Sequence, residues 1–164
     1  MTSVPITRSS NLLRTGIPAG LLAGTLDGIA GLGLYYSATG KNPLGVFPYI
    51  ASGVFGPTAF EGGWQMTAWG LFFHYLIAMI FALFFVWAFG RTRWLRQNWI
   101  AVGIFYGAFV WIVMNLGVLP LSNVSRAPFN LGRAALNMGI LMISVGLPVS
   151  WLTSRNANTT RSGR

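Results

Sequence analysis

Asp27 and His74 are the side chains of this chain whose types and positions could support acid–base chemistry inside an apolar environment. The chain has two acidic residues and one histidine among its 164 residues. Asp27 lies within the apolar stretch 16–38, and His74 lies within the apolar stretch 66–90. A carboxylate beside an imidazole changes protonation near neutral pH, and ionisable groups inside apolar helices mark ligand or proton paths.

The two side chains are predicted to lie at the same depth in a membrane. Asp27 is nine residues from Tyr36 and His74 is eight residues from Met66, near the outer ends of their stretches. At about 1.5 Å per helical residue, both lie roughly 12 to 14 Å below the outer surface. We therefore expect His74 to neutralise Asp27 across a helix contact. Two interpretations are open: a structural brace, or a pair that binds a ligand or relays protons.

The composition of the chain indicates a membrane protein. Hydrophobic residues make up 54% and charged residues 8%, which leaves too few polar side chains to cover a soluble domain. Crossing the hydrocarbon takes about 20 apolar residues, and four stretches are near or above that length. We therefore predict an all-α fold, an integral membrane four-helix bundle forming one domain over residues 1–164. The predicted spans are 16–38, 66–90, 99–119 and 134–152.

Three residues are expected to shape the ends of these spans. Thr15 is placed to cap the first helix through its hydroxyl. Pro120 is expected to end the third helix, and Pro148 to kink the fourth near its end, because proline lacks an N–H and clashes with the preceding turn. The polar tail 154–164 is predicted to be mobile.

The basic residues predict the orientation of the spans. Four spans place the N-terminus, the second loop and the C-terminus on one side, which holds eight of the 11 Lys and Arg residues. They are Arg8, Arg14, Arg91, Arg93, Arg96, Arg155, Arg161 and Arg164. Lys41, Arg126 and Arg133 lie on the other side. Cytoplasmic loops are rich in Lys and Arg, so both termini are predicted to be cytoplasmic. Because these charges set topology, we expect the lipid bilayer as the partner and no nucleic acid.

The first outer connection, residues 39–65, is rich in proline and glycine but contains the apolar stretch 49–55. That stretch is too short to span a bilayer and too apolar to stay in water. We expect a short interfacial helix or a re-entrant segment, which Asn42 and Pro43 could start.

Small residues recur at intervals of four and predict the packing faces. Glycine at this spacing lets another backbone approach closely, as in a glycine zipper. In the second span, Gly70 and His74 share such a row with Ala78 and Ala82. We expect this row to face the glycines of the first span, with Asp27 on the same face. The helix-packing glycines are Gly16, Gly20, Gly24, Gly28, Gly70, Gly103 and Gly107.

Further polar residues are expected to form a layer under the outer connection, with an almost wholly apolar inner half. Such an asymmetry indicates either an outward-open cavity or a hydrogen-bonded brace. Ser144 lies deeper in the fourth span, two turns from Asn137. The supporting residues are Asn115, Asn137, Glu61, Tyr35 and Tyr75.

The sequence gives little support to catalysis or metal binding. The absence of cysteine removes disulfides and every site that needs sulfur ligands. Asp27, Glu61 and His74 could in principle form an iron-type triad, but no second histidine or HxxxH spacing accompanies them. No GxSxG elbow and no phosphate-binding glycine loop occur. We therefore predict no catalytic residues, no metal and no cofactor.

Several segments resemble small bacterial inner-membrane proteins of the YagU-like type, a domain-of-unknown-function family. The likeness covers mainly residues 66–122, with GLFFHYLIAMIFALFF, the basic short loop and GIFYGAFVWIVMNLGVLPLS. This resemblance implies a bacterial inner-membrane location and a part in acid tolerance. The family has no catalytic residues to carry over.

We expect a small non-enzymatic membrane protein that acts as a stress-linked or accessory factor. The first alternative is a proton-coupled or small-solute transporter, oligomeric, in which Asp27 and His74 bind or relay protons. The second alternative is a membrane-embedded enzyme acting on lipid. A second copy of the chain and another membrane protein are both candidate partners.

Overall fold

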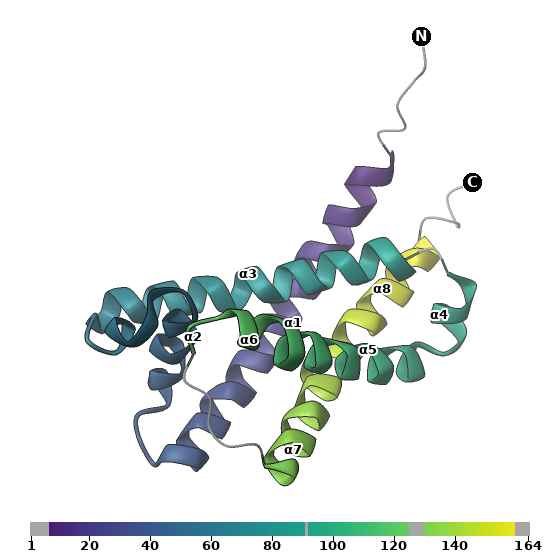
Figure 1. Ribbon diagram of the computed structural model, residues 1–164. Helices are drawn as coiled ribbons and strands as arrows, with labels where there is room; N and C mark the ends of the chain where they lie inside the picture. The colour runs from purple at the N-terminus through teal and green to yellow at the C-terminus, as the bar shows by residue number, and fades with distance from the viewer. Residues whose placement is uncertain (1–6, 91, 125–129, 160–164) are drawn as a thin grey trace.

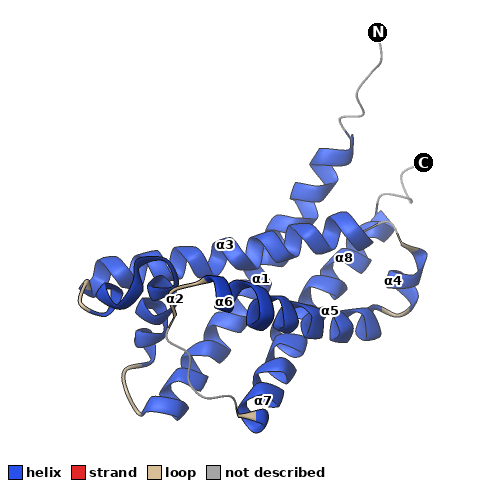
Figure 2. Cartoon of the chain, in the orientation of Figure 1, coloured by secondary structure: helices blue, strands red, loops and turns tan. Residues whose placement is uncertain are grey.

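The structure, a computed structural model, describes residues 7–90, 92–124 and 130–159. These residues are helical throughout, with short connections and no strand among them, which confirms the all-α prediction (Figure 2). The elements are α1 (Thr7–Thr39), η1 (Pro43–Gly45), α2 (Val46–Phe55), η2 (Gly56–Phe60), α3 (Gly63–Phe89), α4 (Arg93–Gln97), α5 (Trp99–Val113), η3 (Met114–Val118), α6 (Leu119–Leu121), α7 (Leu131–Leu141), η4 (Met142–Gly146) and α8 (Leu147–Thr159).

Four helical segments are long and apolar enough to cross a membrane, so the chain has the architecture of a multi-pass membrane protein. They cover Leu12–Thr39, Gly63–Phe89, Trp99–Leu121 and Leu131–Asn156. The first helix begins at Thr7, before its predicted start. Thr15 is therefore buried inside α1 and does not cap it.

The spans pack as a bundle around α1 (Figure 1). α1 contacts α3 on one side and η4 and α8 on the other, while α5 packs against α7, η4 and α8. The start of α1, the end of α8 and α4 lie towards the same end of the bundle (Figure 1). The buried core between these helices consists of Ala19, Ala23, Ala82, Phe85, Leu95, Val102, Tyr106, Val110, Val145 and Val149.

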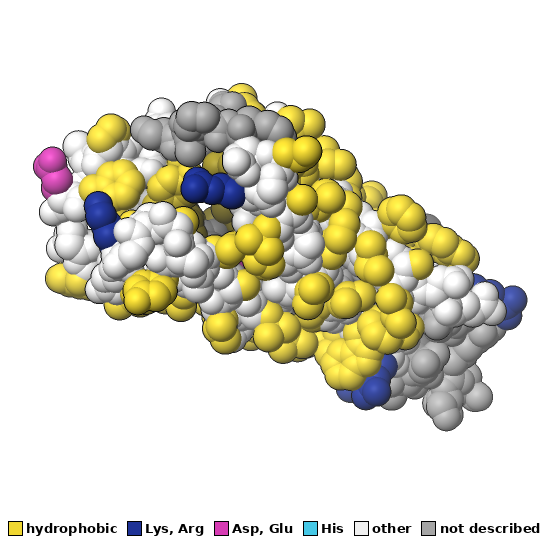
Figure 3. Space-filling model, turned by 90° about the horizontal axis from the view of Figure 1, so that it is seen from below, with side chains coloured by type: hydrophobic (Ala, Val, Ile, Leu, Met, Phe, Trp, Pro, Cys, Tyr) yellow, Lys and Arg dark blue, Asp and Glu magenta, His cyan; other side chains and the backbone are white. Residues whose placement is uncertain are grey.

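Large apolar side chains cover the outside of the bundle. On α3 alone, Phe72, Ile80 and Trp87 are 53%, 57% and 67% exposed. Figure 3 shows hydrophobic side chains over much of one face of the molecule. Such a surface is stable in contact with acyl chains and unstable in water, so the bilayer is its natural surroundings.

Two π-helical turns interrupt the third and fourth spans, and each precedes a proline. The Leu119 amide donates to the Met114 carbonyl, and the Leu147 amide donates to the Met142 carbonyl. Each bond reaches back five residues in place of four. Pro120 and Pro148 follow directly, and their missing N–H groups leave the carbonyls four residues earlier without the usual partner.

These π turns modify both proline predictions. The third helix continues through Pro120, where it was predicted to stop, to Leu121. Pro120 lies in the first turn of the short α6. Pro148 lies at the start of α8, directly after η4, so the disturbance of the fourth helix lies before the proline and not near the helix end.

The outer connection forms the short helix α2 between two 3₁₀ turns. Asn42 accepts a hydrogen bond from the Leu44 amide at 3.0 Å and starts η1, as predicted. α2 packs on α3 where Gly70 has no side chain, because a Cβ there would lie 2.8 Å from the Phe47 Cα. Gly70 therefore serves α2, which corrects its assignment to the α1 contact.

A second anchor ties the end of α2 to the segment after α6. The Asn123 amide donates to the Gly53 carbonyl at 3.0 Å, and the Asn123 side chain donates to the Val54 carbonyl at 3.3 Å. α2 is thus fixed to the second and third spans together.

The predicted polar tail begins inside α8. α8 continues to Thr159, and Ser154 is buried. A helix that continues from the bundle keeps its backbone hydrogen-bonded beyond the last apolar residues. Residues 160–164, with Arg161 and Arg164, lie outside the described residues, as do Arg91 and Arg126.

Replacing Gly107 by alanine should destabilise the bundle. A Cβ there would lie 2.7 Å from the Met142 amide nitrogen, so α5 and η4 would have to separate. We expect a loss of about 1 to 3 kcal/mol, measured as thermal unfolding in detergent. Gly117→Ala on the same span is the control, because its Cβ would meet nothing within 4 Å. Equal stability of both variants would contradict this close packing.

Ionisation of Tyr49 on α2 should require a more alkaline pH than that of free tyrosine. Burial raises the pKa of Tyr49 above its usual value of 10.0. Because the pKa of Tyr49 is higher in the folded than in the unfolded state, its contribution to the free energy of unfolding is constant below the usual pKa. That contribution falls as the pH rises through the folded-state pKa. Absorbance titration should show a late phenolate component that Tyr49→Phe removes. An unchanged titration curve would show that Tyr49 is solvated.

Candidate functional site

The glycine row of α1 faces large side chains of α3, which fill the space above each glycine. A Cβ at Gly20 would lie 2.8 Å from the Met79 sulfur, and one at Gly24 would lie 2.9 Å from the Tyr75 ring. Gly16 lies under Leu83 in the same way. The predicted contact between these helices is therefore formed. Ala78 and His74 of the predicted row lie at Gly24 and Gly28, and longer side chains of α3 pack beside them.

His74 binds the backbone of α1. Its Nε2 lies 2.8 Å from the Gly24 carbonyl oxygen, which can only accept, so Nε2 carries the proton and donates. Gly28 leaves room for the ring, because a Cβ there would lie 3.2 Å from Nε2. In the neutral imidazole the other nitrogen, Nδ1, is then an acceptor. The half-buried ring holds α3 against α1.

Tyr75 adds a second hydrogen bond between the same helices. The Thr25 hydroxyl donates to the Leu21 carbonyl at 2.8 Å, so the Thr25 oxygen accepts from the Tyr75 hydroxyl at 2.9 Å. Hydrogen bonds between helices contribute on the order of 1 kcal/mol in a membrane. With His74, this bond fixes how α1 and α3 are positioned along each other.

Asp27 faces the fourth span. The Ser144 hydroxyl donates to its Oδ1 at 3.0 Å. Ser144 is buried, whereas Asp27 is half-buried. Ser144 is the central residue of η4, four residues before Pro148, so the π turn supplies the hydroxyl that the carboxylate binds. π turns occur frequently at functional sites.

The predicted direct bond between Asp27 and His74 is not formed among the described residues, and helix geometry explains why. Asp27 continues the row of Ala19 and Ala23, which is buried in the core towards η4 and α8. His74 contacts the glycine row, which is displaced by one residue, or about 100° around the helix.

Ser144 is the site residue that sequence reasoning failed to connect to Asp27. A sequence signal did exist, because the serine lies four residues before a proline, where the helical hydrogen-bond ladder must change. η4 also packs closely against α5. Gly146 lies there so close that a Cβ would be 2.9 Å from the Gly107 amide nitrogen.

The polar layer expected under the outer connection does not form as one cluster. Asn115 donates to its own helix at the Trp111 carbonyl, 2.9 Å away. Asn137 and Glu61 are exposed, and the Tyr35 ring packs over Gly45. Only Tyr75 of this set bonds to another helix.

The half of the bundle nearer α4, which was predicted to be the inner half, carries more buried polar groups than expected. The Ser150 hydroxyl donates to the Trp99 carbonyl at 2.7 Å, and the Tyr106 hydroxyl donates to the Phe81 carbonyl at 2.6 Å. Thr153 is buried as well. Hydroxyl-to-carbonyl bonds of this kind fasten helices at both depths, which corrects the prediction of an almost wholly apolar inner half.

A small cavity lies beside His74 where α1, α2 and α3 meet. Its volume is about 120 Å³. Thr25, His74 and Tyr75 are its polar lining, and their donor bonds go to other protein groups. The described part of the chain gathers no three His, Cys, Asp or Glu side chains that could hold a metal ion. The apolar lining consists of Gly24, Gly28, Ile29, Leu32, Phe47 and Leu71.

The Asp27–Ser144 bond should contribute measurable coupling between α1 and the fourth span. We would measure unfolding in detergent for a double-mutant cycle of Asp27→Ala and Ser144→Ala. We expect a coupling free energy of about 0.5 to 1.5 kcal/mol between the two side chains. Ser37→Ala is the control, because that hydroxyl bonds to the Leu34 carbonyl of its own helix. Additive losses from the two site variants would show that the bond contributes nothing.

Comparison with known proteins identifies no matching family model, no similar curated protein and no similar solved structure. The resemblance to YagU-like proteins therefore stays a prediction.

Proposed function

We propose that this chain is a non-enzymatic accessory protein of the bacterial cytoplasmic membrane, with both termini in the cytoplasm. Its intramembrane polar groups act as braces between helices, and its lateral surfaces engage lipid or another membrane protein. Three features support the proposal: the multi-pass architecture, the distribution of basic residues and the resemblance to YagU-like proteins.

The observation that carries the proposal is that the intramembrane polar side chains are engaged in bonds within the protein. Asp27 accepts from Ser144, His74 donates to the Gly24 carbonyl, and Tyr106 donates to the Phe81 carbonyl. Among the described residues, no buried side-chain nitrogen or oxygen lacks a hydrogen-bond partner. A catalytic or transport site usually keeps donors or acceptors free for its substrate, and bracing helices uses them up.

The size of the cavity beside His74 supports the same conclusion. Its volume is about 120 Å³. Pockets for small molecules are several times larger, about 300 Å³ or more. This cavity is therefore too small to hold an organic solute in the described conformation.

The exposed face of α3 supports a lateral role. In the apolar stretch of α3 that could cross the membrane, only 11% is buried in the bundle. The corresponding share is 28% in the third and fourth spans. Aromatic residues are concentrated on this helix, where the Trp69 ring stacks on the Phe73 ring at 5.6 Å. A stiff aromatic surface of this kind fits contact with lipid or with another membrane helix.

The orientation is supported by charge at the end of the bundle that holds both termini. Arg14, Arg93 and Arg155 are exposed at that end. Together with the eight-to-three distribution of basic residues in the sequence, they favour the cytoplasmic side for this end.

One observation favours proton-coupled transport as the second candidate. Asp27 bonds to Ser144 of η4, and His74 of α3 bonds to the Gly24 carbonyl one turn before Asp27 on α1. A carboxylate, a hydroxyl and an imidazole in series can pass protons if water reaches them.

Asp27→Asn separates the two candidates. The asparagine amide oxygen still accepts from Ser144 but cannot ionise, so a brace survives and a proton relay does not. In detergent, we expect the free energy of unfolding of Asp27→Asn to lie within about 0.5 kcal/mol of the wild-type value. We expect that of Asp27→Ala to be lower by about 1 to 3 kcal/mol.

Proteoliposomes with an enclosed pH dye provide the functional readout. We expect proton flux equal to that of protein-free vesicles, and we expect Asp27→Asn to restore acid survival of a deletion strain as fully as the wild-type gene. Proton flux that the wild type supports and Asp27→Asn abolishes would establish the transport function in place of the accessory one.

A further inference from the structure

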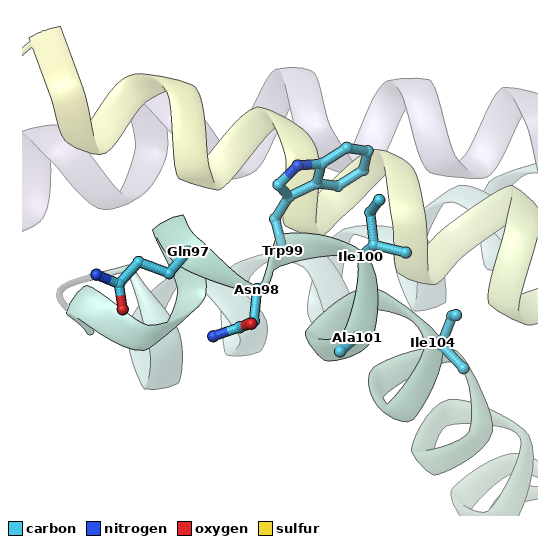
Figure 4. Close-up of a pocket in the computed structure, with 6 residues that line it drawn as sticks. All are labelled: Gln97, Asn98, Trp99, Ile100, Ala101 and Ile104. Carbon is cyan, nitrogen blue, oxygen red and sulfur yellow. The ribbon is translucent and has the colours of Figure 1, made fainter.

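An open hollow lies at the corner between α4 and α5 (Figure 4). Its volume is about 380 Å³. In Figure 4 the amide side chains of Gln97 and Asn98 extend to one side of the corner, and Ile100 and Ile104 lie on the other. The hollow thus changes from polar to apolar along its length. The remaining lining residues are Trp99 and Ala101.

Packing against the bundle holds this corner in place. Leu95 of α4 is fully buried and belongs to the core. At the start of α5, the Trp99 carbonyl accepts from the Ser150 hydroxyl of α8 at 2.7 Å, and the Trp99 ring points towards α8 (Figure 4). The hollow is therefore a fixed feature of the surface.

The position of the corner places it at the level of a membrane surface. α4 lies between the end of one span at Phe89 and the start of the next at Trp99. Trp94 on α4 is 54% exposed, and tryptophan is enriched at membrane interfaces. The polar part of the hollow therefore lies at the headgroups and the isoleucines lie beside the acyl chains.

A basic residue, Arg93, precedes the lining residues of the hollow on α4. Arg93 is exposed and lies four residues before Gln97, so the two share one face of α4. The two acidic residues of the chain lie elsewhere, Asp27 in the middle of a span and Glu61 in the outer connection. Neither of these two carboxylate side chains competes for the guanidinium at this corner.

We propose that this hollow binds an anionic phospholipid. Its phosphate accepts hydrogen bonds from the Arg93 guanidinium and from the amides of Gln97 and Asn98, which are donors suited to phosphate oxygens. The first part of one acyl chain lies along Ile100 and Ile104. This inference rests on the proposed membrane location, but not on the accessory role or the orientation of the termini.

Lipid titration of the full chain in a non-ionic detergent tests the headgroup part of the site. Native mass spectrometry and thermal unfolding should show retention of phosphatidylglycerol and a higher unfolding temperature, and neither for phosphatidylcholine. Arg93→Gln should weaken phosphatidylglycerol binding about fivefold, the effect of one basic residue near an anionic surface. Arg155→Gln is the control, since that guanidinium lies at the same end, 4.3 Å from the centre of the Trp151 ring.

A second pair of variants tests the acyl part without changing charge. Ile104→Ser should weaken binding, whereas Ile112→Ser, on the same helix but outside the hollow, should leave it unchanged. Free glycerol phosphate should not raise the unfolding temperature, because it lacks the chain.

Three outcomes would overturn the site. They are equal binding of both lipids, equal losses from Arg93→Gln and Arg155→Gln, and full stabilisation by glycerol phosphate. Unfolding without added lipid checks that each variant folds. None of these outcomes depends on proton flux or acid survival, so this site and the proposed function fail separately.

Discussion

The bundle depends on the two small-residue rows of α1, which are displaced by one residue. The glycine row receives the side chains of α3, and the alanine row closes the core towards η4 and α8. Because the rows lie about 100° apart around the helix, α1 serves two partners at once. The polar residues follow the same division: His74 bonds at the glycine row, and Asp27 extends the alanine row to Ser144.

Prolines shape the other side of the bundle. Each π turn precedes a proline, and η4 is also where α5 approaches most closely, at glycines with no room for a Cβ. Ser144 is the central residue of η4, so the direction of its hydroxyl depends on the local π geometry before Pro148. The contact between a serine of the fourth span and a carboxylate of the first therefore depends on backbone geometry as well as on residue type.

The sequence predicted the features that depend on hydropathy, composition and spacing. It did not predict the contacts that depend on which side of a helix faces which neighbour. Four apolar helices and the glycine contact of α1 follow from period and length. The partner of Asp27 does not, because choosing between His74 and Ser144 requires knowing which row faces which helix. The fate of Gly70 is similar: its spacing suited the α1 contact, but α2 occupies that surface through Phe47. Depth alone, which Asp27 and His74 share, does not determine direction.

The attachment of α2 has a consequence for biogenesis. This helix is made after the first span, yet it is held by Gly70 of the second and by Asn123 beyond the third. A translating ribosome must therefore deliver three hydrophobic segments before the loop can settle into its final place. Until then, the early hairpin of α1 and α3 presents an unfinished outer surface, on which an insertase or chaperone could act.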